Sequence, residues 1–310
     1  MVTKINRKEI ESLSNLAEAV NKLFGLDLEG RLCIFTNEEM KGDISKHYDE
    51  IGRTIRQQTY KKIAKDFIER VDYKEKGQNM ILDVGCGSGL LDLELNEKTE
   101  DIIIGLDKSQ TMIELANKNK ENRKEEIINK IIKDYERNGC DFSRPISAAC
   151  DIMPEIVDVA HYNNNRAKFF NESVYSLTKL SENKQIADYI ICRNALHRFR
   201  EPEKALQEMY SVLKDNGKIY IRDLKRDADW KTVVERIGEY RWKYPKIVID
   251  YIGAMASMLT KDELEVMLDK LGINNYEIFD GSYRNGKAIK SKEDINEYEK
   301  EVEYVCLIKK

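Results

Sequence analysis

The sequence predicts a doubly wound α/β fold with a mostly parallel sheet, and two segments carry this prediction. Residues 81–84 form an apolar strand that runs directly into a glycine-rich turn at residues 85–89. Residues 101–107 form a second buried-strand pattern that ends in an acid. A strand, a glycine turn and a helix in this order are typical of the first βα unit of such a sheet, where ligands bind at the carboxyl ends of the strands.

The spacing of the glycines and the acids around them indicate which ligand this turn binds. The glycines are spaced Gly-x-Gly-x-Gly, not Gly-x-Gly-x-x-Gly as in dinucleotide sites. Asp83 precedes the turn, where a carboxylate opposes a pyrophosphate and suits a ligand with an amino group and a sulfonium. Asp107 ends the next strand, where a carboxylate can accept both ribose hydroxyls. These features predict S-adenosylmethionine (SAM) as the cofactor.

Residues 81–107 resemble the cofactor-binding half of class I SAM-dependent methyltransferases. The resemblance implies a Rossmann-like sheet of seven strands, with a final hairpin antiparallel to the rest, and S-adenosylhomocysteine (SAH) as the product. It also implies a cofactor site built from the glycine turn, both acids and residues that follow the later strands. The residues expected to bind the cofactor are Asp83, Gly85, Cys86, Gly87, Gly89, Asp107, Lys108, Met112, Ser173, Val174, Arg193, Asn194, Tyr48 and Arg53.

Composition and charge narrow the function classes. The 310 residues include 52 basic and 56 acidic side chains, for a net charge of −4. This balance argues against broad phosphate-backbone binding, and we expect no DNA partner. No apolar run approaches the roughly 18 residues of a membrane helix, and the N-terminus lacks the apolar segment of a signal peptide. Six cysteines without a Cys-x-x-Cys pair predict a reduced, cytoplasmic protein without a metal site.

Residues 1–75 are predicted to form a helical cap, followed by a SAM-binding domain at residues 76–310. Apolar residues recur at helical spacing within this first part. Its Tyr-Asp segment is similar to the "YD" segment of many small-molecule methyltransferases, whose N-terminal helices close over the cofactor. By that resemblance Tyr48 is a candidate lid residue, and Arg53 and Arg56 are candidate partners of the methionine carboxylate. Ordinary helix packing and surface charge are the alternative interpretation of all three.

Between the second and third strands the chain is longer than this fold requires. A helix is expected after Ser109 as its cap, and it continues into a charged tract. Residues of about 118–165 are therefore predicted to be a helical insertion, which either builds the substrate wall or is only a surface helix. The third strand has two candidates, of which one contains Asp151, the acid that the family usually places beside adenine. The other, residues 167–174, has the better distance to the next strand and places Ser173 at the adenine.

Residues 186–199 are expected to carry the chemical step. A strand ends near residue 192, and the following residues enter the crevice at the carboxyl edge of the sheet. With the segments up to residue 226 they resemble methyltransferases grouped with the quinone-biosynthesis C-methyltransferases and natural-product enzymes. The resemblance places Arg193 and Asn194 near the methionine moiety. His197 is the candidate general base, because histidine titrates near neutral pH; the alternative is that it only shapes the pocket. Arg198 stands where the family usually has a second histidine.

The later elements follow from local signals. Pro202 predicts a helix start, residues 215–217 a turn, and residues 218–224 the fifth strand. Residues of about 227–275 are predicted to form the substrate side, with aromatic and methionine side chains that are either a pocket wall or plain core. Thr260 is expected to cap a helix within it. Residues 275–280 and 304–308 are expected to form the antiparallel edge strands.

The sequence as a whole predicts a SAM-dependent methyltransferase that acts on a small or medium-sized organic acceptor by in-line methyl transfer. One alternative is a peptide, a carrier-bound or a tRNA acceptor, because of the insertion and the Lys/Arg-rich helix at 118–137. Another is a SAM-binding partner subunit with little activity of its own, because the residues at 173 and 198 depart from the family pattern. A homo-oligomer or a partner protein is compatible with each, and no membrane partner is expected.

Overall fold

The computed structural model describes residues 39–74, 79–137, 165–228, 243–281, 283–284, 287–288 and 302–310. Its centre is a seven-stranded sheet in the order β3-β2-β1-β4-β5-β9-β6. Only β9 runs against its neighbours, so the predicted doubly wound, mostly parallel fold is confirmed. The strands are β1 (Met80–Val84), β2 (Ile102–Asp107), β3 (Ala167–Asn171), β4 (Ala187–Arg193), β5 (Leu213–Leu224), β6 (Tyr276–Asp280) and β9 (Glu303–Lys309).

Helices cover both faces of this sheet because the side chains of its central strands alternate between two apolar clusters. Ile81 belongs to the cluster on one face and Leu82 to the cluster on the other, as the period of two in a strand requires. The first cluster packs against α3 (Gln57–Arg70), α4 (Leu90–Asn96) and α5 (Gln110–Arg137). The second packs against α8 (Pro202–Val212) and α11 (Lys261–Lys270), with the short α7 (Leu177–Leu180) beside α8.

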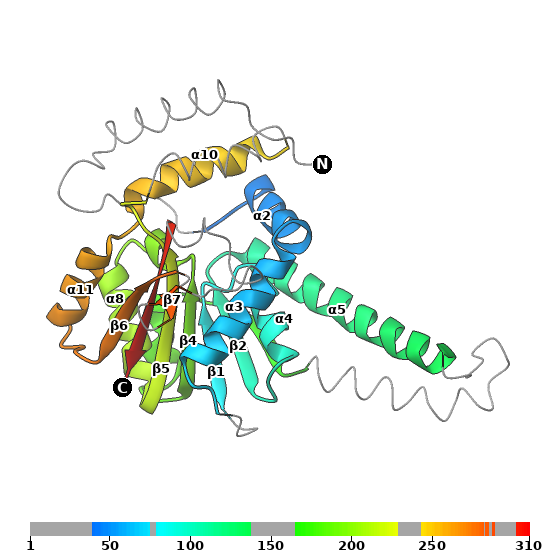
Figure 1. Cartoon of the computed structure of the whole chain (residues 1–310), viewed down its shortest axis with the longest axis horizontal. Helices are drawn as coiled ribbons and strands as arrows, with labels where there is room; N and C mark the ends of the chain where they lie inside the picture. The colour runs from blue at the N-terminus through cyan, green and yellow to red at the C-terminus, as the bar shows by residue number, and fades with distance from the viewer. Residues whose placement is uncertain are drawn as a thin grey trace.

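Two further helices lie above the carboxyl ends of the parallel strands (Figure 1). They are α2 (Asp43–Thr54) and α10 (Pro245–Ala254), and a third apolar cluster joins them through Ile51, Tyr244 and Val248. The remaining short elements are η1 (Val174–Ser176), η2 (Leu196–Arg198), η3 (Met255–Ser257) and the pair β7 (Tyr283–Arg284) and β8 (Lys287–Ala288). Among the residues that the structure describes, no helix has both the length and the apolar character needed to cross a bilayer.

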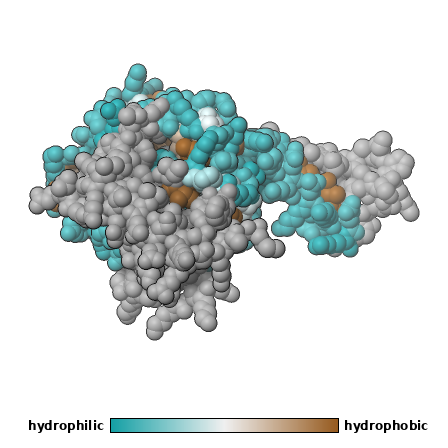
Figure 2. Space-filling view, turned by 90° about the horizontal axis from the view of Figure 1, so that it is seen from above, coloured by the Kyte–Doolittle hydropathy of each residue, from teal (hydrophilic) through white to brown (hydrophobic). Residues whose placement is uncertain are grey.

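Helix α5 begins on the sheet and then projects away from the body (Figure 1). Ser109 caps it, since its Oγ accepts a hydrogen bond from Met112 N at 3.3 Å. The first turns are buried against the sheet, whereas four isoleucines of the outer part are only half-buried. Figure 2 shows hydrophobic atoms on this projecting part. The rest of the predicted insertion, with Asp151, lies outside the described residues.

Most predicted elements are present, and two differ from expectation. The third strand is the candidate at residues 167–174, which pairs with β2 as β3, and Thr260 caps α11 as predicted, in a capping box with Glu263. The turn expected at residues 215–217 instead lies within β5, which begins directly after α8, and Asn216 adopts a positive φ of 64° there. Of the two strands expected at the edge, only β6 lies there, because β9 inserts between β5 and β6. The division of the chain near residue 75 stays a prediction.

Candidate active site

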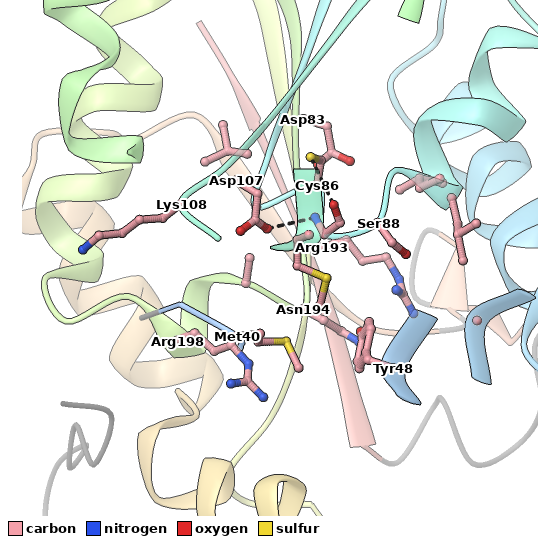
Figure 3. Close-up of a pocket in the computed structure, with 18 of the residues that line it drawn as sticks. Met40, Tyr48, Asp83, Cys86, Ser88, Asp107, Lys108, Arg193, Asn194 and Arg198 are labelled. Carbon is pink, nitrogen blue, oxygen red and sulfur yellow. Dashed lines mark hydrogen bonds between the residues drawn. The ribbon is translucent and has the colours of Figure 1, made fainter. Parts of the chain in front are cut away.

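A cavity lies at the carboxyl ends of β1, β2 and β4, beneath α2 and α10, and Figure 3 shows part of its wall. It has a volume of about 1510 Å³, including the part open to solvent. Thirteen of the predicted site residues line it, although they come from elements far apart in the chain. These residues are Tyr48, Asp83, Gly85, Cys86, Gly87, Asp107, Lys108, Met112, Ser173, Val174, Arg193, Asn194 and His197.

The glycine turn has the shape that the sequence predicted. Its first and last glycines have φ angles of 79° and 72°, which side chains rarely adopt. A Cβ atom at Gly85 would lie 2.4 Å from the Cβ of Ala195, and one at Gly89 would lie 2.6 Å from the ring of Phe169. Gly89 does not line the cavity but forms the N-cap of α4. The turn therefore depends on glycine both for its backbone and for close packing.

The carboxylate of Asp107 faces the glycine turn in Figure 3, whereas the side chain of Lys108 points away from it. The Asp107 carboxylate accepts hydrogen bonds from Gly87 N at 2.9 Å and from Ser109 N at 2.8 Å. Burial raises the pKa of Asp107, and these two backbone donors lower it. The two N–H groups thus hold a carboxylate at the cavity wall, where its remaining lone pairs can accept hydroxyl groups.

Asp83 forms part of a buried carboxyl pair with Asp92, which lies in the first turn of α4. Burial is the main cause that raises the pKa of Asp83 to about 7; hydrogen bonding with Asp92 and the charge of Arg193 lower it. Burial and the charge of Asp83 raise the pKa of Asp92 well above its usual value. The pair therefore retains a proton near neutral pH. Sequence reasoning missed Asp92, although an acid within the apolar stretch 90–95 is a usable signal.

Arg193 brings a buried positive charge to the same cavity. Its side chain is 9% exposed, and its guanidinium carbon lies 4.8 Å from the centre of the Tyr60 ring. Its Nε atom has no hydrogen-bond partner among the described residues. The adjacent Asn194 has a positive φ of 50° and a buried Oδ1 atom that also lacks a partner in this part of the chain. Such strained, unsatisfied positions are typical of binding sites.

His197 forms a buried dyad with Asp223 at the cavity wall. Its Nδ1 lies 2.6 Å from Asp223 Oδ1, and its backbone N–H donates to Asp223 Oδ2 at 2.8 Å. The His197 side chain is only 3% exposed, and that of Asp223 is fully buried. In the tautomer with the proton on Nδ1, this nitrogen donates to Asp223 Oδ1, and Nε2 is the nitrogen that can accept a proton. Sequence reasoning did not select Asp223, although it is the acid near the end of the fifth strand.

A further part of the cavity wall is mostly apolar and comes largely from α10. It contains one ion pair, between Arg198 and Asp250, whose side chains are both partly buried. The apolar residues that accompany them in the wall are Phe199, Leu224, Ile247, Tyr251 and Ala254. An apolar surface with one charged pair can hold an organic molecule and orient its polar group.

Of the three residues proposed from the Tyr-Asp segment, the structure separates Arg53 from the other two. Tyr48 and Arg56 line the cavity, as does Gly52 between them. Successive residues of a helix point about 100° apart, so Arg53 faces a neighbouring hollow and binds Asp49 Oδ2 through Nε at 2.8 Å. Of the two arginines, Arg56 is therefore the one that borders the cavity. Arg56 lies eight residues after Tyr48 and beyond the end of α2 at Thr54, so helical spacing alone does not place it.

Both the sequence and the fold of this chain resemble those of known proteins. A family model described as a methyltransferase domain matches residues 55–278, which is more than half of the chain. The fold resembles a candidate SAM-dependent methyltransferase from Methanococcus maripaludis, with 21% identity, a TM-score of 0.54, and coverage of 90% of this chain and 97% of that one. It also resembles the plantazolicin methyltransferase BpumL, solved with a triazolic desmethylPZN analog and SAH, with 18% identity, a TM-score of 0.54, and coverage of 98% and 99%.

Proposed function

The chain belongs to the methyltransferase-domain family, and from that premise we propose that it transfers the methyl group of SAM to a small or medium-sized organic acceptor whose reacting group gives up a proton to His197. The products are the methylated acceptor and SAH. The observation that carries this proposal is the buried His197–Asp223 dyad in the wall of the cavity that the glycine turn borders. The hydrogen bond between His197 and Asp223 favours one tautomer of the histidine. The cavity, which is large enough for the cofactor, is thereby provided with a base.

The residues of the cavity fit SAM at each of its polar groups. Asp107 suits the ribose hydroxyls, and Ser173 with Val174 borders the side where adenine is expected. The Asp83 carboxylate suits the amino group and the sulfonium charge. The buried guanidinium of Arg193 suits the methionine carboxylate, since a buried charge is stabilised by an opposite one. SAM, when bound, supplies a methyl group on a sulfonium, which is already a good leaving group.

The protein's own contribution is then mainly positioning. The roof formed by α2 and α10 keeps water from the reacting groups, and the apolar wall holds the acceptor against the cofactor. Holding two reactants at the correct distance can contribute about 7–11 kcal/mol to the barrier reduction. His197 adds proton acceptance through Nε2, while Asp223 orients the ring and stabilises the imidazolium that forms.

A labelling experiment tests this proposal. The purified protein is incubated with radiolabelled SAM and a fractionated extract of the source cell, and label is counted in the small-molecule, protein and RNA fractions. We expect label in the small-molecule fraction, and we expect Asp83→Ala to abolish it because the cofactor loses its carboxylate partner. SAM binding without label in any fraction would contradict the proposal and favour a partner subunit with little activity of its own.

A macromolecular acceptor is the second candidate, and the shape of α5 supports it. This helix projects from the body beside the cavity-bearing part of the molecule (Figure 1). Its outer part carries four basic side chains, Lys124, Lys130, Lys133 and Arg137, among an equal number of acidic ones. Label fixed in the protein or RNA fraction would favour this candidate, and its loss on removal of these four charges would give α5 a docking role.

Cofactor affinity is expected to depend on pH through Asp83. Because the pKa of this buried carboxyl is about 7, it is protonated below that pH and ionised above it. A cationic ligand prefers the carboxylate, so SAM binding weakens as pH falls, by up to about tenfold per pH unit. Calorimetric titration between about pH 5.5 and 8.5 measures this dependence. Asp83→Asn removes the titrating group, so its affinity should be lower and nearly independent of pH; an unchanged pH profile would contradict the assignment.

A further inference from the structure

One amide group joins the roof of the cavity to the glycine turn. Asn119 of α5 donates through Nδ2 to Asp49 Oδ1 of α2 at 2.7 Å and to the backbone carbonyl of Ser88 at 3.0 Å. The side chains of Asn119 and Asp49 are almost completely buried, at 5% and 2% exposed. The other oxygen of Asp49 accepts from Arg53 Nε at 2.8 Å. We refer to the contact of Asp49, Asn119 and Ser88 as the latch.

The latch determines the position of the cavity-lining face of α2. Tyr48 and Gly52 lie one residue before and three residues after Asp49 on this helix, and both line the cavity. Gly52 allows a close approach to α4, because a Cβ atom there would lie 2.5 Å from Leu90 Cδ1. A shift of Asp49 therefore moves the side chains that cover the cofactor side of the cavity.

Two ion pairs that α2 forms with residues in and just before α10 are different in kind. Glu50 pairs with Lys243 at 2.8 Å, and Asp43 pairs with Lys246 at 2.6 Å, on the surface of the molecule. Exposed ion pairs such as these add little and are screened by salt. The latch is instead a charge-assisted hydrogen bond in a buried place, where a lost donor leaves a carboxylate unsatisfied. It is thus stronger than these two ion pairs, and it acts beside the apolar cluster that joins α2 to α10 through Ile51.

We propose that Asn119 is a positioning residue that couples closure of α2 over the cavity to the conformation of the glycine turn. The side-chain amide of Asn119 donates one hydrogen bond to each of two acceptors. Both hydrogen bonds form only when the Ser88 carbonyl and Asp49 are both in place. A ligand that orders the turn places Ser88 and thereby favours the latched position of α2. The inference rests on the proposed function, because it takes the cofactor SAM, or its product SAH, as that ligand.

Hydrogen exchange of α2 tests the coupling directly, with SAH as the probe. In the full-length wild-type protein, the amides of residues 43–54 should gain protection when SAH is added. Asn119→Ala should lose most of this gain, and its dissociation constant for SAH should rise about 10- to 100-fold, as expected for a buried hydrogen bond to a charged group. Asn119→Leu keeps roughly the size of the side chain and removes its donor, so it should behave like Asn119→Ala.

Asn117 provides a matched control on the same helix. Its side chain is exposed, and its Nδ2 donates to Ile113 O at 3.0 Å. Asn117→Ala should therefore bind SAH and protect α2 as the wild type does. The double variant of Asp49→Ala and Asn119→Ala should bind SAH no more than about twofold more weakly than the weaker-binding of the two single variants. The reason is that both substitutions remove the same hydrogen bond.

The outcomes separate the latch from the proposed function. If the wild type binds neither SAM nor SAH, the proposed function fails and the latch fails with it. If the wild type binds SAH and Asn119→Ala or Asn119→Leu still gains full protection of α2, only the latch is overturned. A purely structural role for Asn119 would lower the thermal midpoint and leave the SAH-induced protection unchanged, which also overturns it.

Discussion

His197→Ala should lower kcat about 10²- to 10⁴-fold while the KM for SAM changes little. The reason is that the His197 ring lies in the cavity wall and is oriented by Asp223 at 2.6 Å, whereas the cofactor contacts come from other residues. Steady-state kinetics with the acceptor identified by labelling measures the split between kcat and KM. The residual rate should be that of a positioned acceptor and methyl group without a base.

Asp223→Asn tests the same dyad through the orientation of the ring. An asparagine at this position can donate to Nδ1, which favours the tautomer with the proton on Nε2 and so removes the acceptor that Nε2 provides. We expect a loss of kcat comparable to that of His197→Ala, and no further loss in the double variant, because the two residues act as one unit.

His47 supplies a control for histidine loss as such. It lies on α2 and packs edge-on against Tyr244, with 5.4 Å between the ring centres, and it does not line the cavity. His47→Ala should change kcat by no more than a few-fold. Equal rates for the wild type and His197→Ala would show that His197 only shapes the pocket.

The parts of the site that were predictable from sequence are those built by contiguous residues. The strand, the glycine turn and the following acid of residues 81–107 form one local unit, so their spacing is enough to predict where Asp83, Gly85 and Asp107 meet. The chain after β4 is similarly local, which is why Asn194 and His197 were placed at the cavity. The fold class followed from the same units, because a parallel βα arrangement has few alternatives.

The parts that were missed depend on register and on helix rotation. His197 and Asp223 meet because β4 and β5 pair with Arg193 opposite Arg222, a register that the sequence alone does not specify. Arg53 was placed at the cofactor by proximity to Tyr48, yet the rotation of α2 turns it toward Asp49. The insertion of β9 between β5 and β6 is likewise a long-range choice.

Asp66→Ala should lower the free energy of unfolding by about 3–5 kcal/mol, because it breaks a buried ionic network and removes the carboxylate that pairs with the buried Arg70. Asp66 of α3 accepts from Arg70 Nε at 2.8 Å and from Tyr220 OH at 2.7 Å, and it lies 3.6 Å from Arg222 Nη1. Arg222 is fully buried in β5 and donates to Glu303 of β9 at 2.6 Å. The network therefore joins α3 to two neighbouring strands.

Denaturant unfolding at neutral pH measures this loss, with Glu69→Ala as the control on the same helix. Glu69 forms a surface pair with Lys65 at 3.9 Å, and such pairs contribute about 0–1 kcal/mol. Asp66→Asn keeps the shape and removes the charge, so its loss should lie between those of the two alanine variants. If Asp66→Ala costs no more than Glu69→Ala, the network does not hold α3 on the sheet. The wall that α3 provides through Tyr60 beneath Arg193 would then depend on apolar packing alone.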